Sequence, residues 1–109
     1  MNPRVKKLWL EALRSGAYTQ GRHQLRSGNS YCCLGVLCDL HSKETGTSWE
    51  GERYIEELNG TPRTVADWAG LSDAVPTVLY ERHRFSLSQL NDCGYSFEDI
   101  ADIIDKQQL

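Results

Sequence analysis

Residues 30–41 read SYCCLGVLCDLH, an apolar block that holds three of the four cysteines of the chain. At helical spacing, one flank of this block carries Leu34, Leu37, Cys38 and His41, and the other flank carries Val36 and Leu40. A helix that is apolar on nearly all sides must be buried by the rest of its domain. We therefore expect a buried central helix over residues 33–43, ended by Thr45-Gly46.

Two further helices are indicated by their first residues. Asn2-Pro3 is a capping residue followed by proline, and apolar residues then recur every three or four positions up to Ser15-Gly16, which predicts a helix over residues 3–14. Ser96 with Asp99 resembles a capping box, and the apolar residues that follow predict a helix over residues 96–107.

The segments between these helices carry shorter signals. Gly28-Asn29 is typical of a tight turn and predicts a hairpin of two antiparallel strands, residues 22–27 and 30–32. Thr61-Pro62 repeats the cap-then-proline pattern and predicts a short helix that ends at Gly70. Residues 75–80 are rich in β-branched side chains and fit an edge strand, and Ser86 is a candidate cap for one or two helical turns. Residues 47–55 are expected to form an irregular strand or a loop.

These elements predict a fold class. We expect a small, helix-rich α+β domain over residues 1–109, with a short antiparallel sheet packed on the buried central helix and the first and last helices on its flanks. A chain of 109 residues fits one domain, and 39% hydrophobic with 25% charged residues is ordinary for a globular protein. No repeat, low-complexity segment or linker divides the chain.

Charge is distributed unevenly along the chain. Residues 1–27 hold six basic side chains and Glu11 alone as acid, whereas the remaining residues hold six basic and 14 acidic ones. The total of −3 argues against nucleic acid as a partner, and we expect the basic start to pair with the acidic last helix of the same molecule. No apolar run approaches the length of a bilayer, and the uneven cysteines do not resemble a disulfide framework, so we expect no membrane contact and a cytoplasmic location.

Three blocks of the sequence resemble a set of small proteins encoded by phages and prophages. They read KLWLEALRSG at residues 7–16, YCCLGVLCDL at residues 31–40 and LNDCGYSFEDIADII at residues 90–104. In that set serine is common where this chain has Cys93, which argues against a catalytic or ligand role for this thiol. The resemblance implies a phage or prophage setting and supplies no activity, cofactor or site residue.

Zinc is the sharpest chemical hypothesis that the residue types allow. The alternative metal ligands are Cys32, Cys33, Cys38 and His41, with Cys93 or His23 to complete a tetrahedral site. Their spacing argues against it, because structural zinc sites usually bring two separate ligand pairs, each held by a tight turn. We therefore predict no metal and no other cofactor, and keep a zinc-stabilised module as the alternative.

A cysteine-dependent enzyme is the third hypothesis. It needs a thiol of lowered pKa beside a histidine, and the pairs available are Cys33, at the start of the central helix, with His23 or His83. No spacing in the sequence brings such a pair together. Buried free thiols explain the same residues, so we do not expect an enzyme.

The remaining functional signal is a concentration of arginine and aromatic residues near the predicted hairpin. The candidate ligand-binding residues are Tyr18, Arg22, His23, Arg26, Trp49, Arg53 and Tyr54. Guanidinium groups beside aromatic rings suit planar or phosphorylated ligands and protein contacts, although an ordinary wet surface can hold the same residues. The sequence predicts a non-enzymatic accessory protein that binds a host protein or a small nucleotide-like anion; it does not predict an oligomeric state.

Overall fold

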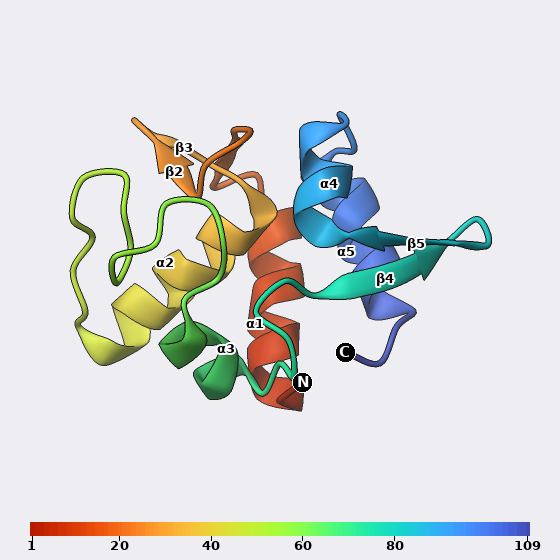
Figure 1. Cartoon of the computed structure of the whole chain (residues 1–109), viewed down its shortest axis with the longest axis horizontal. Helices are drawn as coiled ribbons and strands as arrows, with labels where there is room; N and C mark the ends of the chain where they lie inside the picture. The colour runs from red at the N-terminus through yellow and green to blue at the C-terminus, as the bar shows by residue number, and fades with distance from the viewer.

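The apolar block forms helix α2 (Cys33–Thr45), which lies beside helix α1 (Pro3–Arg14) in the computed structural model of residues 1–109 (Figure 1). All residues of α2 from its start to Cys38 are buried, as the apolar pattern predicts. The helix continues to Thr45, one half-turn beyond the predicted end, and Gly46 ends it with a left-handed φ of 79°. The buried central helix is therefore confirmed.

Helix α1 packs against α2 on one side and helix α5 (Phe97–Asp105) on another (Figure 1). Asn2 Oδ1 accepts hydrogen bonds from the first free backbone N–H groups of α1, and Ser96 Oγ accepts one from Asp99 N at the start of α5. Both caps are the predicted ones. The last helix ends two residues earlier than expected, at Asp105.

Ion pairs between the ends of the chain follow the predicted charge asymmetry. Arg14 on α1 lies 2.8 Å from a carboxylate oxygen of Asp102 and 3.4 Å from one of Asp105, both on α5. Arg4 instead pairs with Glu44 on α2 at 2.6 Å. Part of the basic start is thus neutralised within the molecule.

A small mixed sheet covers the start of α2. It contains strands β1 (Thr19–Gln20), β2 (Arg26–Ser27) and β3 (Ser30–Tyr31), with β3 between the other two. β2 and β3 form the predicted antiparallel hairpin, whereas β1 runs parallel to β3. The predicted strand over residues 22–27 was wrong for most of its length, because His23 adopts a left-handed φ of 69°.

A second, antiparallel sheet was only half expected. Strand β4 (Thr77–Tyr80) lies within the predicted edge strand, and β5 (His83–Ser86) pairs with it through a two-residue turn at Glu81-Arg82. β4 lies against α5, and only the turn of the hairpin extends beyond the helices (Figure 1). Ser86 then caps helix α4 (Leu87–Asp92), as predicted.

Helix α3 (Arg63–Ala69) begins differently from its prediction. Pro62 occupies the capping position, and Thr61 is buried with no partner for its hydroxyl, so Thr61 does not cap the helix. The predicted end at Gly70 is confirmed by its left-handed φ of 72°. The chain is one α+β domain of five helices and two small sheets, and none of its helices combines the length and hydropathy that a bilayer crossing requires.

Candidate recognition surfaces

Five of the seven predicted ligand-binding residues lie around the mixed sheet, in two groups. Tyr18, Arg26 and Trp49 meet on one side, together with residues that the sequence did not single out. Arg22 and His23 follow β1 and lie toward the end of α4, where His23 faces Asp92 and the Arg22 guanidinium lies beside Gly94. Arg53 is exposed on the long loop between α2 and α3 and makes no salt bridge.

The first group forms a continuous patch that we call the aromatic face, made of Tyr18, Arg26, Tyr31, Lys43 and Trp49. The ring centroids of Tyr18 and Tyr31 are 5.1 Å apart, and those of Tyr31 and Trp49 are 5.9 Å apart, both edge to face. All three rings are half-buried, so each one also presents surface to solvent. Aromatic pairs of this geometry hold one another in fixed orientations.

Arg26 lies across this face. Its guanidinium carbon is 5.6 Å from the ring centroid of Tyr31 and 5.5 Å from that of Trp49, and its Nε donates to Gly28 O at 3.0 Å. No carboxylate forms an ion pair with it. The guanidinium is therefore held in place by rings and a backbone carbonyl while its terminal amino groups stay available.

The carboxylate of Asp39, on α2, contacts three residues of the aromatic face. Its carboxylate accepts hydrogen bonds from Tyr18 Oη at 2.6 Å and Trp49 Nε1 at 3.0 Å, and Lys43 Nζ lies 3.4 Å away. Burial first, and then the hydrogen bond to Asp39, raises the pKa of Tyr18 to about 12. Tyr18 thus stays a neutral hydrogen-bond donor at physiological pH.

Tyr54 is a correction to the predicted binding set. Its side chain is fully buried, and its Oη lies 2.6 Å from His41 Nδ1. The His41 ring in turn packs edge to face on Trp68, with centroids 5.1 Å apart. Tyr54 is therefore a packing residue beneath the aromatic face and does not reach a ligand from this position.

The alternative zinc ligands point to separate partners. Cys32 Sγ caps α2 by accepting from Gly35 N at 3.4 Å, and Cys33 Sγ donates to Leu87 O at 3.6 Å. Cys38 is fully buried, and His41 is engaged with Tyr54. No three His, Cys, Asp or Glu side chains come together in a geometry that could hold a metal ion. Nothing in the arrangement supports the zinc-stabilised module.

The pair of a thiol and a histidine that nucleophilic chemistry requires does not form at Cys33. This thiol is fully buried against Leu87, and burial raises its pKa well above the ordinary value, which is opposite to the shift that activates a nucleophile. His23 is engaged with Asp92, and His83 lies in β5 beside Phe85. The structure offers no support for a catalytic role of Cys33.

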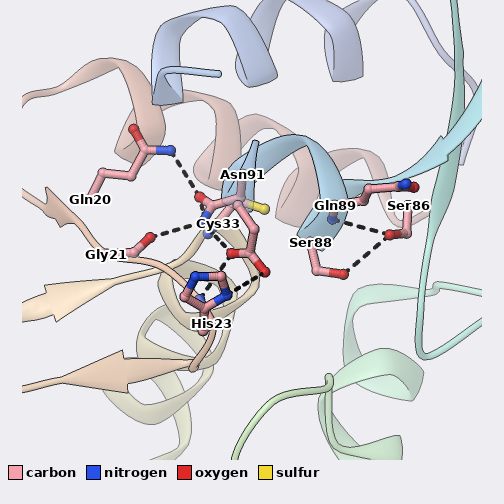
Figure 2. A network of polar contacts seen from close by, with 9 residues as sticks. Gln20, Gly21, His23, Cys33, Ser86, Ser88, Gln89 and Asn91 are labelled. Atoms are coloured by element: carbon pink, nitrogen blue, oxygen red, sulfur yellow. Dashed lines mark hydrogen bonds and ion pairs between the residues drawn. The ribbon is translucent and has the colours of Figure 1, made fainter. Parts of the chain in front are cut away.

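Away from the aromatic face, Asn91 joins three segments of the chain: its own helix α4, the end of β1 and the start of α2 (Figure 2). Its Oδ1 accepts from Gln20 Nε2 at 2.9 Å and from Cys33 N at 3.2 Å, and its Nδ2 donates to Gly21 O at 2.8 Å. The side chain is fully buried, so these bonds replace all contact with water. This network fixes the position of α4 against β1 and α2.

The neighbouring Asp92 fixes His23. Its Oδ1 accepts from His23 N at 2.9 Å, and its Oδ2 lies 3.4 Å from His23 Nδ1. These two contacts hold both the left-handed backbone and the imidazole ring of His23, which is drawn in Figure 2. Sequence reasoning named His23 but missed Asp92, because only the fold brings the end of α4 to the loop after β1.

Comparison with known proteins adds one relationship. Residues 1–108 match the model of a family described as "Domain of unknown function (DUF8296)". The chain belongs to this DUF8296 family. Neither a curated protein nor a solved structure shows significant similarity to it. The match covers nearly the whole domain and assigns no chemistry to it.

Proposed function

We propose that this DUF8296 domain is a non-enzymatic binding protein that docks a host protein on its aromatic face, as a cytoplasmic accessory protein of a phage or prophage. The observation that carries this proposal is Arg26, whose unpaired guanidinium is held on the rings of Tyr31 and Trp49. Arginine, tyrosine and tryptophan dominate the energetic centres of protein interfaces. Four cysteines without a disulfide fit a reducing compartment, and the phage setting is supported by the resemblance of the three sequence blocks.

The shape of the aromatic face favours a protein over a small anion. None of the five main cavities is lined by Arg26, Tyr31 or Trp49, whereas small ligands are usually held in concave sites. The Gln24 side chain, oriented to satisfy its hydrogen bonds, donates to both Arg26 O and the Glu52 carboxylate, so an acidic group lies close to this face. A broad surface with rigid aromatic anchors and mixed charge suits a protein partner.

The experiment compares two matched arginine variants as immobilised baits in host lysate. Arg26→Ala removes the guanidinium from the aromatic face, while Arg63→Ala removes an exposed arginine on α3 that pairs with Asp67. We expect a host protein to be retained by the wild type and by Arg63→Ala, and to be lost with Arg26→Ala. Circular dichroism of both variants checks that the fold is unchanged.

The retained protein is then purified and its affinity is measured by calorimetry. Removal of a central arginine anchor is expected to cost about 2 kcal/mol or more of binding free energy. Equal affinity for the wild type and Arg26→Ala, or retention of no protein by any bait, would refute the proposal. A partner released equally by Arg26→Ala and Arg63→Ala would also contradict it, because binding would then depend on total charge.

A further inference from the structure

A second candidate site lies away from the aromatic face, between the loop after β1 and the start of α4. It is a cleft of about 230 Å³, and its walls come from four separate segments: His23, Gln24, Cys32, Asn59, Ser88 and Asp92. Five of these six residues are polar. The cleft is smaller than the range of about 300–1,000 Å³ typical of sites for drug-sized ligands, so it fits one ring system with a few polar atoms.

The walls of the cleft are held in place by contacts between its own residues and with neighbouring segments. Leu25 N donates to Leu58 O at 2.9 Å, which ties the Asn59 segment to the residues between His23 and β2. Asp92 holds the His23 backbone at 2.9 Å and its ring at 3.4 Å, and Asn91 anchors the end of α4 to Gly21. A left-handed φ at a residue other than glycine costs free energy, and residues strained in this way cluster at functional sites.

Several polar groups at the cleft are not used by the fold. The Asn59 amide has no hydrogen-bond partner, and Ser88 Oγ contacts only Ser86 Oγ at 3.2 Å (Figure 2). The His23 side chain is 77% exposed, so its ring face and Nε2 are open to a ligand. Arg22, the preceding residue, is also exposed and forms no ion pair.

We propose that this cleft binds the base of a nucleoside monophosphate. The His23 ring provides a flat surface for stacking, since histidine stacks on unpaired bases in the same way as other aromatic side chains. The Asn59 amide offers a donor and an acceptor side by side, which matches the edge of a nucleobase, and Ser88 adds a hydroxyl. The Arg22 guanidinium lies outside the cleft beside Gly94, two residues beyond Asp92, and supplies the positive charge for a phosphate there.

The proposal is independent of the proposed function, because the two surfaces share no residue. Arg26, Tyr31 and Trp49 do not line the cleft, and His23, Asn59 and Ser88 do not belong to the aromatic face. A host protein can therefore bind whether or not a nucleotide does. Failure of one proposal leaves the other intact.

The test is a titration of the isotope-labelled full chain followed by nuclear magnetic resonance. The probes are the four common ribonucleoside monophosphates, their nucleosides and inorganic phosphate, each up to millimolar concentration. We expect at least one monophosphate to shift the backbone amides of His23, Asn59 and Ser88, with smaller or no shifts on the aromatic face. The corresponding nucleoside is expected to shift the same amides with about tenfold weaker affinity, since it lacks the charge-assisted contact.

Three variants separate the roles of the residues. Arg22→Ala is expected to weaken the affinity for the monophosphate about tenfold and to leave the affinity for the nucleoside unchanged. Asn59→Ala is expected to weaken binding of both the monophosphate and the nucleoside. Arg53→Ala removes an unpaired arginine outside the cleft and is expected to change the binding of neither. The amide spectrum of each variant shows whether it is folded.

Three results would overturn the proposal. The first is the absence of shifts with every monophosphate. The second is binding of inorganic phosphate as tight as that of the monophosphates, because the base would then contribute nothing. The third is equal weakening by Arg22→Ala and Arg53→Ala, because the effect would then reflect net charge.

Discussion

At the scale of single residues, Gly35 is where the chain tolerates no side chain. It lies in the first turn of α2, and a Cβ atom placed on it would be 1.8 Å from Leu25 O. The neighbour is backbone, held by Cys32 N donating to Leu25 O, so it cannot rotate away as a flexible side chain could. This close approach sets the distance between the central helix and the segment that leads into β2.

Gly35→Ala is therefore expected to lower the free energy of unfolding by about 3 kcal/mol, the upper part of the range for overpacking a core. Gly60→Ala is the matched control, because nothing lies within 4 Å of its Cβ position. Urea unfolding followed by tryptophan fluorescence measures both variants. Equal stability of the two would show that α2 can shift away from Leu25 at little cost.

His41 gives the fold a pH dependence. Burial lowers its pKa below the ordinary value, and the charge of Glu44 opposes this shift. The folded state then binds fewer protons than the unfolded state, in which histidine titrates near about 6.5. The stability that the lowered pKa of His41 contributes to the folded state is fully present above that pH. It is lost as the pH falls toward the lowered pKa of the folded state.

We expect the wild type to lose stability between pH 7 and 5 more steeply than His41→Phe. The phenyl ring keeps the packing on Trp68 and removes the titration, although it leaves Tyr54 Oη without its partner and so lowers stability at every pH. Urea unfolding across this pH range gives both slopes. Equal slopes would assign the pH dependence to groups other than His41.

At the scale of elements, the β4–β5 hairpin contains a costly turn. Glu81 and Arg82 have φ values of 49° and 69°, so both central residues are left-handed, as in a type I′ turn. Asn-Gly is the pair that this turn favours. The chain has two charged side chains there instead, each with a Cβ atom that disfavours this conformation.

Replacing Glu81-Arg82 with Asn-Gly is expected to raise the free energy of unfolding by about 1 kcal/mol, because it removes left-handed strain. The control Glu81→Gln/Arg82→Gln removes the same charges and keeps the unfavourable backbone. Thermal unfolding by circular dichroism compares the three proteins. A gain as large in the control would assign the effect to charge.

The elements differ in how far the sequence determines them. Helices α1 and α5 were predicted because Asn2 and Ser96 are local caps followed by a clear apolar period. Strand β5 was missed because a turn without glycine or asparagine gives no sequence signal. The parallel partner β1 was missed because its pairing with β3 depends on the tertiary fold.

The same contrast holds for the candidate sites. Tyr18, Arg26 and Trp49 were named from residue type alone, and the fold brings them together. Asp39 and Asn91 organise the two surfaces but were not predicted, since their bonds to Tyr18 and Gly21 join positions far apart in the chain. Residue type thus indicated candidates for recognition, whereas the polar groups that position them depended on topology.

At the scale of the whole molecule, the reactivity of the four thiols measures how far solvent and reagents reach the core. Cys32, Cys33 and Cys38 are buried in the core, and Cys93 is exposed after α4. We expect iodoacetamide to alkylate only Cys93 in the native protein and all four cysteines in denaturant, as measured by intact mass and peptide mapping. Rapid native labelling of Cys32 would instead show that the cleft opens to the cap of α2.

The two ends of the chain are in contact. The Met1 ammonium group donates to Leu109 O, and Asn2 N donates to Ala69 O at 2.8 Å, so the N-terminus is fixed where the last residues arrive (Figure 1). Termini that meet on the surface allow circular permutation. A short peptide could join them, with new ends opened in the exposed Glu50-Gly51 turn, to give a rearranged gene product with the same topology in space.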